Sequence, residues 1–329
     1  MSDLLRQSRN NAVSLQLHLE SGDAVREMIS REDGLFFIAT KQIIRVRSPD
    51  QLDPDLKHAS APWEQSLYLP HGGSDPLVAR TVIQTARLAE IFFAKTSDQY
   101  KTLSDISWEV MNSLQSLRFI KNRLEGQINK IVALVENDLA AYTTGESPKP
   151  LPIVEYYDIE FRSFANEVRR TLSAISELFL PLIGQDFSNG HFHKAQEWAA
   201  QVRGEDSLLS QMLKGDQRWV KTWIDIRIAI EHPQKDKFLE TSNFSLEASR
   251  TVRLPTWRFV HPDYDLGRPQ NLLTVFDTCI NNLLKFYEDI QIALTDGHLP
   301  ASFKIAADLI PEDQRDSNLP LRYKFYRIA

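Results

Sequence analysis

The residues best suited to chemistry in this sequence are an arginine and a histidine at the end of an apolar helical stretch. Arg227 and His232 lie five positions apart in the segment Arg227-Ile-Ala-Ile-Glu-His232-Pro233. A guanidinium can hold a phosphate through paired hydrogen bonds, and an imidazole can donate or accept a proton near neutral pH. This pair therefore suits the binding or cleavage of a phosphate-containing substrate.

The helix that carries the motif limits what the two side chains can do. Residues five apart in a helix point about 140° away from each other. Pro233 disfavours helical geometry at His232, so the histidine should lean out of the last turn, where unpaired carbonyl groups favour a protonated imidazole. In the alternative interpretation, Arg227 pairs with Glu231 four residues on and His232 only caps the helix. Asp225 and Glu231 are the expected supporting groups.

Basic residues on two predicted helices are candidates for holding phosphate. Arg162 and Arg169 belong to a helix expected at about 153–180, and Arg218 and Lys221 precede the motif. If the two helices are adjacent, these side chains form a local positive strip. A solvated helix face is the alternative interpretation of the same charges.

The overall composition limits the classes of function. The chain has 329 residues, 42% of them hydrophobic, and a net charge of −6, which argues against a broadly basic nucleic-acid-binding surface. No apolar run reaches membrane-spanning length, there is no secretory signal pattern, and the single cysteine, Cys279, cannot form an intrachain disulfide. We therefore expect a cytoplasmic protein with no membrane association.

The sequence offers little for a metal or a cofactor. It has no CxxC, HExxH or GxSxG motif, and His71-Gly-Gly-Ser74 lacks the spacing of a phosphate-binding loop. His191 and His193 would face the same way on a strand, but the surrounding pattern predicts the start of a helix. No metal site and no cofactor are expected.

Hydrophobic spacing predicts a mainly α protein of antiparallel helical bundles with small β additions. Residues 1–75 should hold an N-terminal helix, a shorter helix from Asp23, a short β element at 35–46 and a proline-rich loop. Residues 76–150 predict a long-helix hairpin. The segment 151–300 predicts a helical bundle with a β-hairpin excursion at 239–260. Residues 301–329 predict a short helix at 302–309 and an extended tail.

The segment from about 151 to 296 resembles a HEPN domain (higher eukaryotes and prokaryotes nucleotide-binding). The resemblance lies in Arg-Ile-Ala-Ile-Glu-His-Pro, which is similar to the R-x4-6-H motif near the end of the penultimate core helix in that family. The helix with Phe161-Arg-Ser-Phe164 is similar to the first core helix of the family. The resemblance implies a bundle of four to five helices and a homodimer that brings two motifs to one cleft.

The resemblance also implies an activity, metal-independent cleavage of RNA. Arg227 would stabilise the charge on the scissile phosphate, and His232 would be a general acid or base. Such an endoribonuclease could be a prokaryotic toxin or defence effector. Ile228 occupies a position that is usually polar in catalytic members, which favours the alternative, a non-catalytic HEPN-like module that binds a nucleotide, RNA or a protein partner. The geometry of a dimer would discriminate the two.

Overall fold

The computed structural model describes residues 16–58, 61–144, 149–264, 268–295 and 304–328. The chain divides into two compact units. One contains residues 1–107 together with 299–329, and the other contains residues 108–298. No helix in the described ranges combines the length and the apolar composition of a membrane span.

The first unit is built on an antiparallel sheet in the order β1-β2-β3-β4. The strands are β1 (Val25–Arg31), β2 (Gly34–Ala39), β3 (Ile43–Arg47) and β4 (Glu64–Leu69), and the short helix α2 (Pro49–Leu52) lies between the last two. The inward side chains of Phe36, Ile38 and Ile43 are fully buried. Alternating apolar residues on neighbouring strands thus form the buried face of the sheet.

Helical segments and a hairpin complete this unit. The segments α3 (Pro76–Val78), η1 (Ala79–Ile83) and α4 (Gln84–Phe92) follow the sheet, and β10 (Lys304–Leu309) pairs with β11 (Tyr323–Ile328), with the short helix η2 (Glu312–Gln314) between them. The side-chain carbonyl oxygen of the buried Gln84 accepts hydrogen bonds of 3.0 Å from the backbone N–H groups of Arg322 and Tyr323. Strands from the end of the chain are thereby fastened to α4.

Several local expectations in this unit are wrong. The segment after Asp23 forms β1 instead of a helix, the proline-rich region contains β4, and the segment expected as a short helix at 302–309 contains the strand β10. Each of these strands is stabilised by pairing with another segment, so local propensity did not decide its structure. The tight strand pair near 35–46 and the extended tail are confirmed as β2–β3 and β11. Residues 1–15 of the expected N-terminal helix lie outside the described ranges, and residues 16–20 are not helical.

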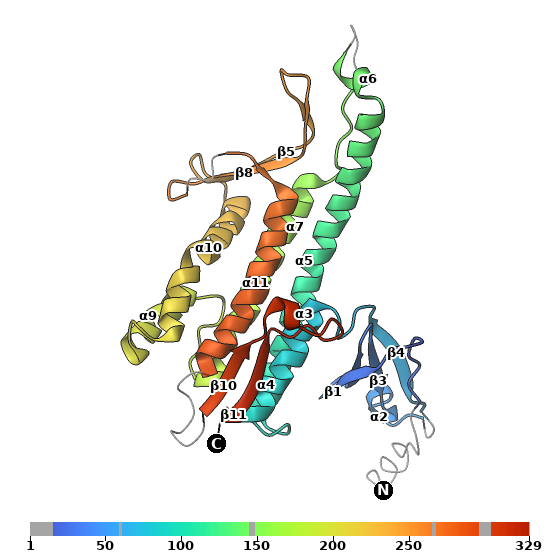
Figure 1. Cartoon of the computed structure of the whole chain (residues 1–329), viewed down its shortest axis with the longest axis vertical. Coiled ribbons are helices and arrows are strands. Elements are labelled where there is room, and N and C mark those ends of the chain that lie inside the picture. The colour runs from blue at the N-terminus through green and yellow to red at the C-terminus, as the bar shows by residue number, and fades with distance from the viewer. Residues whose placement is uncertain (1–15, 59–60, 145–148, 265–267, 296–303, 329) are drawn as a thin grey trace. The chain divides into compact units, whose positions relative to one another are not determined.

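The second unit is a bundle of long helices, which confirms a mainly α protein. In Figure 1, α5 (Asp98–Asn137, whose first turns belong to the first unit), α7 (Tyr157–Ser176), α10 (Leu208–Glu231) and α11 (Leu272–Thr295) run side by side in the bundle. The shorter helices are α6 (Leu139–Thr143), α8 (Phe179–Ile183) and α9 (Phe192–Arg203). The core contains stacked rings of Phe164 and Phe276, whose centroids are 3.5 Å apart, and Trp223 lies 5.7 Å from Phe164. The long helices predicted from apolar spacing in this unit are confirmed, except that the helix expected at about 153–180 is divided into α7 and α8.

A small β platform lies at the end of the bundle where α11 begins (Figure 1). The strands β5 (Phe238–Ser242), β8 (Thr256–Val260) and β9 (Gln270–Asn271) form a sheet in the order β5-β8-β9. At its tip, β6 (Ser245–Leu246) pairs with β7 (Val252–Arg253). The buried Trp257 anchors β8 on the bundle, 5.3 Å from the ring of Phe161. The predicted β-hairpin excursion is confirmed.

Candidate functional site

The Arg–His motif occupies the last turn of α10, and the helix ends just before Pro233, as the sequence predicts. His232 is the C-cap, with φ −130° and ψ 64°, and its N–H donates to the carbonyl oxygen of Ile228 at 2.8 Å. Its imidazole is exposed and forms no hydrogen bond or ion pair with any residue in the described ranges. The helix therefore stops at Glu231 and presents a free imidazole to solvent.

Arg227 points along the helix to its neighbour one turn later. Its Nη1 lies 2.7 Å from Glu231 Oε2, and the two side chains are 36% and 34% exposed. No hydrogen bond or ion pair joins Arg227 to His232. Ile228, between them, is 45% exposed. In a single chain the guanidinium thus belongs to a helical ion pair, as the second interpretation of the sequence expected.

A second arginine, Arg169 on α7, lies within the electrostatic reach of Arg227. Burial first, and then the charge of Arg227, lowers the pKa of Arg169. Its Nη2 donates to the backbone carbonyl of Asn189, and its Nη1 is buried with no hydrogen-bond partner among the described residues. No carboxylate in the described part of the chain forms an ion pair with it. A half-buried cation next to a like charge and without a counter-ion is unfavourable, so an anion here would relieve both costs.

The loop between α8 and α9 closes over this guanidinium because of one glycine. Asn189 and Gly190 both have left-handed backbone conformations, with φ of 64° and 72°. The N–H of Gly190 donates to Ser176 Oγ at 2.9 Å. A Cβ at this position would lie 2.2 Å from Arg169 Nη1. Glycine therefore supplies both the backbone conformation and the space for the guanidinium.

Further basic side chains follow Gly190 in the same loop and the start of α9. Desolvation, followed by the charges of Lys194, His193 and Arg169, lowers the pKa of His191. The rings of His191 and His193 are 5.8 Å apart. We call Arg169, Arg227, His191 and Lys194 the basic cluster. The like charges of Arg169, Arg227 and Lys194 in this cluster favour a bound anion, to which His191 can donate a hydrogen bond.

Asp225, expected to support the motif, is engaged elsewhere. Its Oδ2 accepts hydrogen bonds from the Tyr264 hydroxyl at 2.7 Å and from Lys221 Nζ at 2.9 Å. His261, with a side chain only 6% exposed, places Nε2 4.0 Å from the same oxygen. Lys221 also reaches Asp263 at 3.4 Å. These contacts attach the segment after β8 to α10, and they direct Asp225 away from Arg227.

The four phosphate candidates therefore have different environments. Arg169 lies within the electrostatic reach of Arg227. Lys221, in contrast, is neutralised by two carboxylates. Its hydrogen bond to Asp225 is the main cause that raises the pKa of Lys221. Arg218 is exposed on α10 and its guanidinium has no partner among the described residues. Arg162, also unpaired, lines a cavity of about 70 Å³ beside Pro233. The structure thus groups only one of the four with the motif arginine.

Sequence reasoning missed the loop at 189–191. The sequence marked His191 and His193 only as a weak metal pair, and it gave no reason to place them beside Arg169. The Asn189-Gly190 dipeptide is a turn signal that could have indicated a sharp loop there. Within the described ranges, no group of three His, Cys, Asp or Glu residues could hold a metal ion. No protein-family model, no curated protein and no solved structure matches this chain.

Proposed function

We propose that the helical unit is a HEPN-like module that binds a phosphate group of RNA or of a nucleotide at the basic cluster. The observation that carries this proposal is the Arg169 guanidinium, which is held in place by Asn189 and has a buried nitrogen to which no described residue is hydrogen-bonded. Arg227 lies close enough to lower its pKa. Two guanidiniums without a shared carboxylate are suited to a phosphate, which accepts several charge-assisted hydrogen bonds.

The Arg227–Glu231 ion pair determines how Arg227 can contribute to phosphate binding. Both side chains are partly exposed, so the pair contributes only about 0.3–0.5 kcal/mol to the stability of the helix. A phosphate can outcompete a single carboxylate at this cost. Arg169 is therefore the preformed part of the site, and Arg227 is the part that is recruited when the ligand binds.

Binding is tested by fluorescence anisotropy with a short labelled single-stranded RNA and with a labelled ATP, over a range of salt concentrations. Arg169→Gln and Arg227→Gln should each weaken binding by roughly tenfold or more, since a charge-assisted hydrogen bond contributes about 1.5–3 kcal/mol. For RNA, each lost phosphate contact should also reduce the slope of log K against log salt by about 0.7.

The matched control is Arg170→Gln. Arg170 is the next residue on α7, its side chain is 59% exposed, and it pairs with Glu109 at 3.5 Å outside the basic cluster. This variant should bind like the parent protein. Equal losses in Arg170→Gln and Arg169→Gln, or no binding of either probe at low salt, would contradict the proposal.

A second candidate function is a metal-independent endoribonuclease formed by two copies of this chain. The exposed imidazole of His232 at the helix end, which has no partner within the described ranges, favours it, because such a group is free to move a proton. In that reaction Arg227 would leave Glu231 and hold the scissile phosphate. His232 would take the proton of the ribose 2′-hydroxyl or give one to the leaving 5′-oxygen, and the product would be a 2′,3′-cyclic phosphate.

The catalytic candidate is tested by incubating RNA with the purified protein in EDTA and mapping the product ends. His232→Ala should abolish cleavage while retaining RNA binding, and Arg227→Ala should reduce both. Sedimentation measured alongside should show a dimer in the active preparation. Equal cleavage by all three proteins would remove this motif as the source of the activity.

A further inference from the structure

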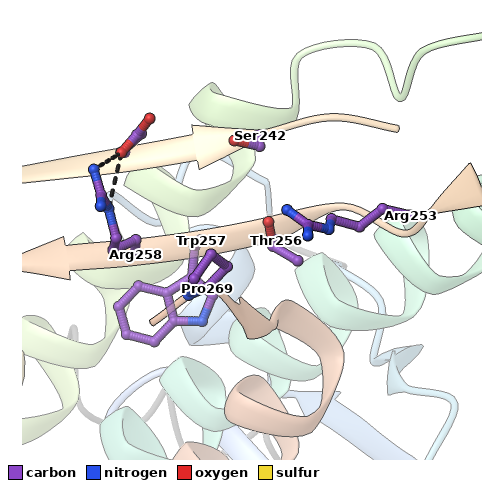
Figure 2. Close-up of a pocket in the computed structure, with 7 residues that line it drawn as sticks. Ser242, Arg253, Thr256, Trp257, Arg258 and Pro269 are labelled. Carbon is purple, nitrogen blue, oxygen red and sulfur yellow. Dashed lines mark hydrogen bonds and ion pairs between the residues drawn. The ribbon is translucent and has the colours of Figure 1, made fainter. Parts of the chain in front are cut away.

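The arginines that line a pocket on the β5–β8–β9 platform are neutralised by carboxylates. Figure 2 shows this pocket, where Arg258 Nε donates to Glu240 Oε2 at 2.9 Å. Arg253, which also lines the pocket, places Nη2 2.9 Å from Glu247 Oε1. The charges of this pocket are therefore balanced, and they give it no reason to bind an anion.

The basic cluster differs from this pocket because most of its side chains have no carboxylate partner. Within the described ranges, Arg169, His191 and Lys194 form no ion pair, and only Arg227 has one, with Glu231. His191 and Lys194 are both exposed at the start of α9. Of the four side chains in the cluster, only the imidazole changes its charge near neutral pH. His191 is therefore the group through which pH can act on this site.

The loop and the helix that follows it place His191 in a positive environment. His191 comes directly after Gly190, where a Cβ would collide with the Arg169 guanidinium, so the backbone of the loop lies close to that charge. His191 is also the N-cap of α9, a helix of 12 residues, and its side chain makes no capping hydrogen bond. The N-terminal end of a helix carries a partial positive charge, which disfavours a protonated imidazole beside it.

The charged side chains that act on His191 have the same sign when they are ionised. Desolvation, and then the charges of Lys194, His193 and Arg169, lower the pKa of His191. The centroid of the His193 ring is 5.8 Å from that of His191. No described carboxylate is among the groups that shift this pKa. A bound phosphate would be the first negative charge in this environment, and it would raise the pKa of His191.

We propose that phosphate binding at the basic cluster is coupled to the uptake of a proton by His191, so that the site holds its ligand more tightly in acid. This coupling rests on the proposed phosphate site and regulates it. Neutral His191 can donate one hydrogen bond, whereas the protonated ring donates from both nitrogens and adds a positive charge beside the ligand. Protonation and binding favour each other reciprocally, so each pKa unit by which the ligand raises the pKa of His191 corresponds to about tenfold in affinity.

The pH range of the effect lies between the pKa of His191 in the free site and its pKa in the complex. Below this range the imidazole is charged before the ligand arrives, and affinity is highest. Above it the imidazole stays neutral in the complex, and affinity is lowest. Because the pKa in the free site is lowered from the ordinary histidine value of 6.5, the range begins below that pH.

The probe is a short labelled oligouridylate with hydroxyl ends. Its phosphodiesters and its bases keep their charge near neutral pH, whereas a terminal phosphate would itself titrate near pH 6. Binding is measured by anisotropy at about pH 5.5 and about pH 8, at constant ionic strength, for the parent, His191→Gln and the control His193→Gln. His193 is an exposed imidazole two residues later on the same helix. Circular dichroism at both pH values verifies that each variant is folded.

We expect the parent and His193→Gln to bind roughly tenfold more tightly at the lower pH, if the ligand raises the pKa of His191 by about one unit. His191→Gln should bind nearly equally at the two pH values. At the higher pH it should bind like the parent, because the glutamine amide replaces the hydrogen-bond donor of a neutral imidazole. This pattern separates a titrating group from a residue that only supports the fold of the loop.

Calorimetry near pH 6.5 in two buffers with different ionisation enthalpies counts the protons that are bound with the ligand. The parent should take up a fraction of a proton, and His191→Gln should take up none. Uptake that persists in His191→Gln, or that is lost in His193→Gln instead, overturns the coupling, as does equal binding by the parent at the two pH values. Equal binding leaves the phosphate site itself intact, whereas no binding at either pH contradicts both proposals.

Discussion

Replacing Gly190 by alanine tests whether the loop at 184–191 is built around the Arg169 guanidinium. Two costs add at this position. The backbone at φ 72° is left-handed, which costs a residue with a Cβ about 1–2 kcal/mol. The new Cβ would also lie 2.2 Å from Arg169 Nη1, so the guanidinium must move and release the carbonyl of Asn189. A charge-assisted hydrogen bond contributes about 1.5–3 kcal/mol. The expected destabilisation by Gly190→Ala is therefore about 2.5–5 kcal/mol.

Gly184→Ala provides the matched control. Gly184 has nearly the same conformation, with φ 68°, but a Cβ there meets no atom within 4 Å. It should cost only the backbone component, about 1–2 kcal/mol. The difference between the two variants isolates the contact with Arg169.

The assay is urea unfolding of the full chain, followed by the fluorescence and circular dichroism of the helical unit. The same substitution is also made in an Arg169→Ala background, where Gly190→Ala should cost no more than Gly184→Ala. The anisotropy of labelled RNA should fall in parallel, because the displaced guanidinium no longer faces the ligand. Equal costs at the two glycines, or an unchanged cost in the Arg169→Ala background, would refute this reasoning.

Three further outcomes follow from other groups. Burial raises the pKa of Tyr157, whose hydroxyl has no hydrogen-bond partner in the described ranges. The folded state therefore keeps this proton while the unfolded phenol loses it above about pH 10, so the free energy of unfolding falls as pH rises further. Urea midpoints at about pH 8 and about pH 11 should therefore differ less in Tyr157→Phe than in the parent, with no loss of stability at the lower pH; a larger difference would contradict the assignment. Cys279 is buried and its thiol pKa is raised by burial, so a thiol reagent should react only as fast as the helical unit opens, and rapid labelling of the native protein would be inconsistent with this packing. Glu231→Gln should lower the unfolding free energy by only about 0.3–0.5 kcal/mol and strengthen RNA binding several-fold by releasing Arg227, and weaker binding would argue against its recruitment.

The helices were predictable because their signal is local. Apolar residues at three- and four-residue steps located α5, α7, α10 and α11, and Pro233 fixed the end of α10. The strands β1 and β10 were not predictable in this way. β1 pairs with β2 across a tight turn and β10 pairs with β11 across a longer connection, and in both cases pairing outweighed a local pattern that suggested a helix.

In the candidate site, too, local contacts were predictable from the sequence and long-range contacts were not. The Arg227–Glu231 pair is a contact between residues four apart, which a helical sequence can anticipate. The placement of Arg169 depends on Asn189 and Gly190, which approach it only because the loop before α9 folds back over α7. The diversion of Asp225 to Tyr264 likewise requires a segment nearly forty positions away. Contacts of this kind become visible only when the packing of the elements is known.

The β10–β11 hairpin has a consequence for how this protein is made. A ribosome delivers all of residues 108–298 before it delivers the two backbone donors, at Arg322 and Tyr323, that meet Gln84. The first part of a chain usually folds first during synthesis. Here residues 108–298 can fold before the first unit has received the β10–β11 hairpin. During that interval the side-chain oxygen of Gln84 lacks its two backbone donors.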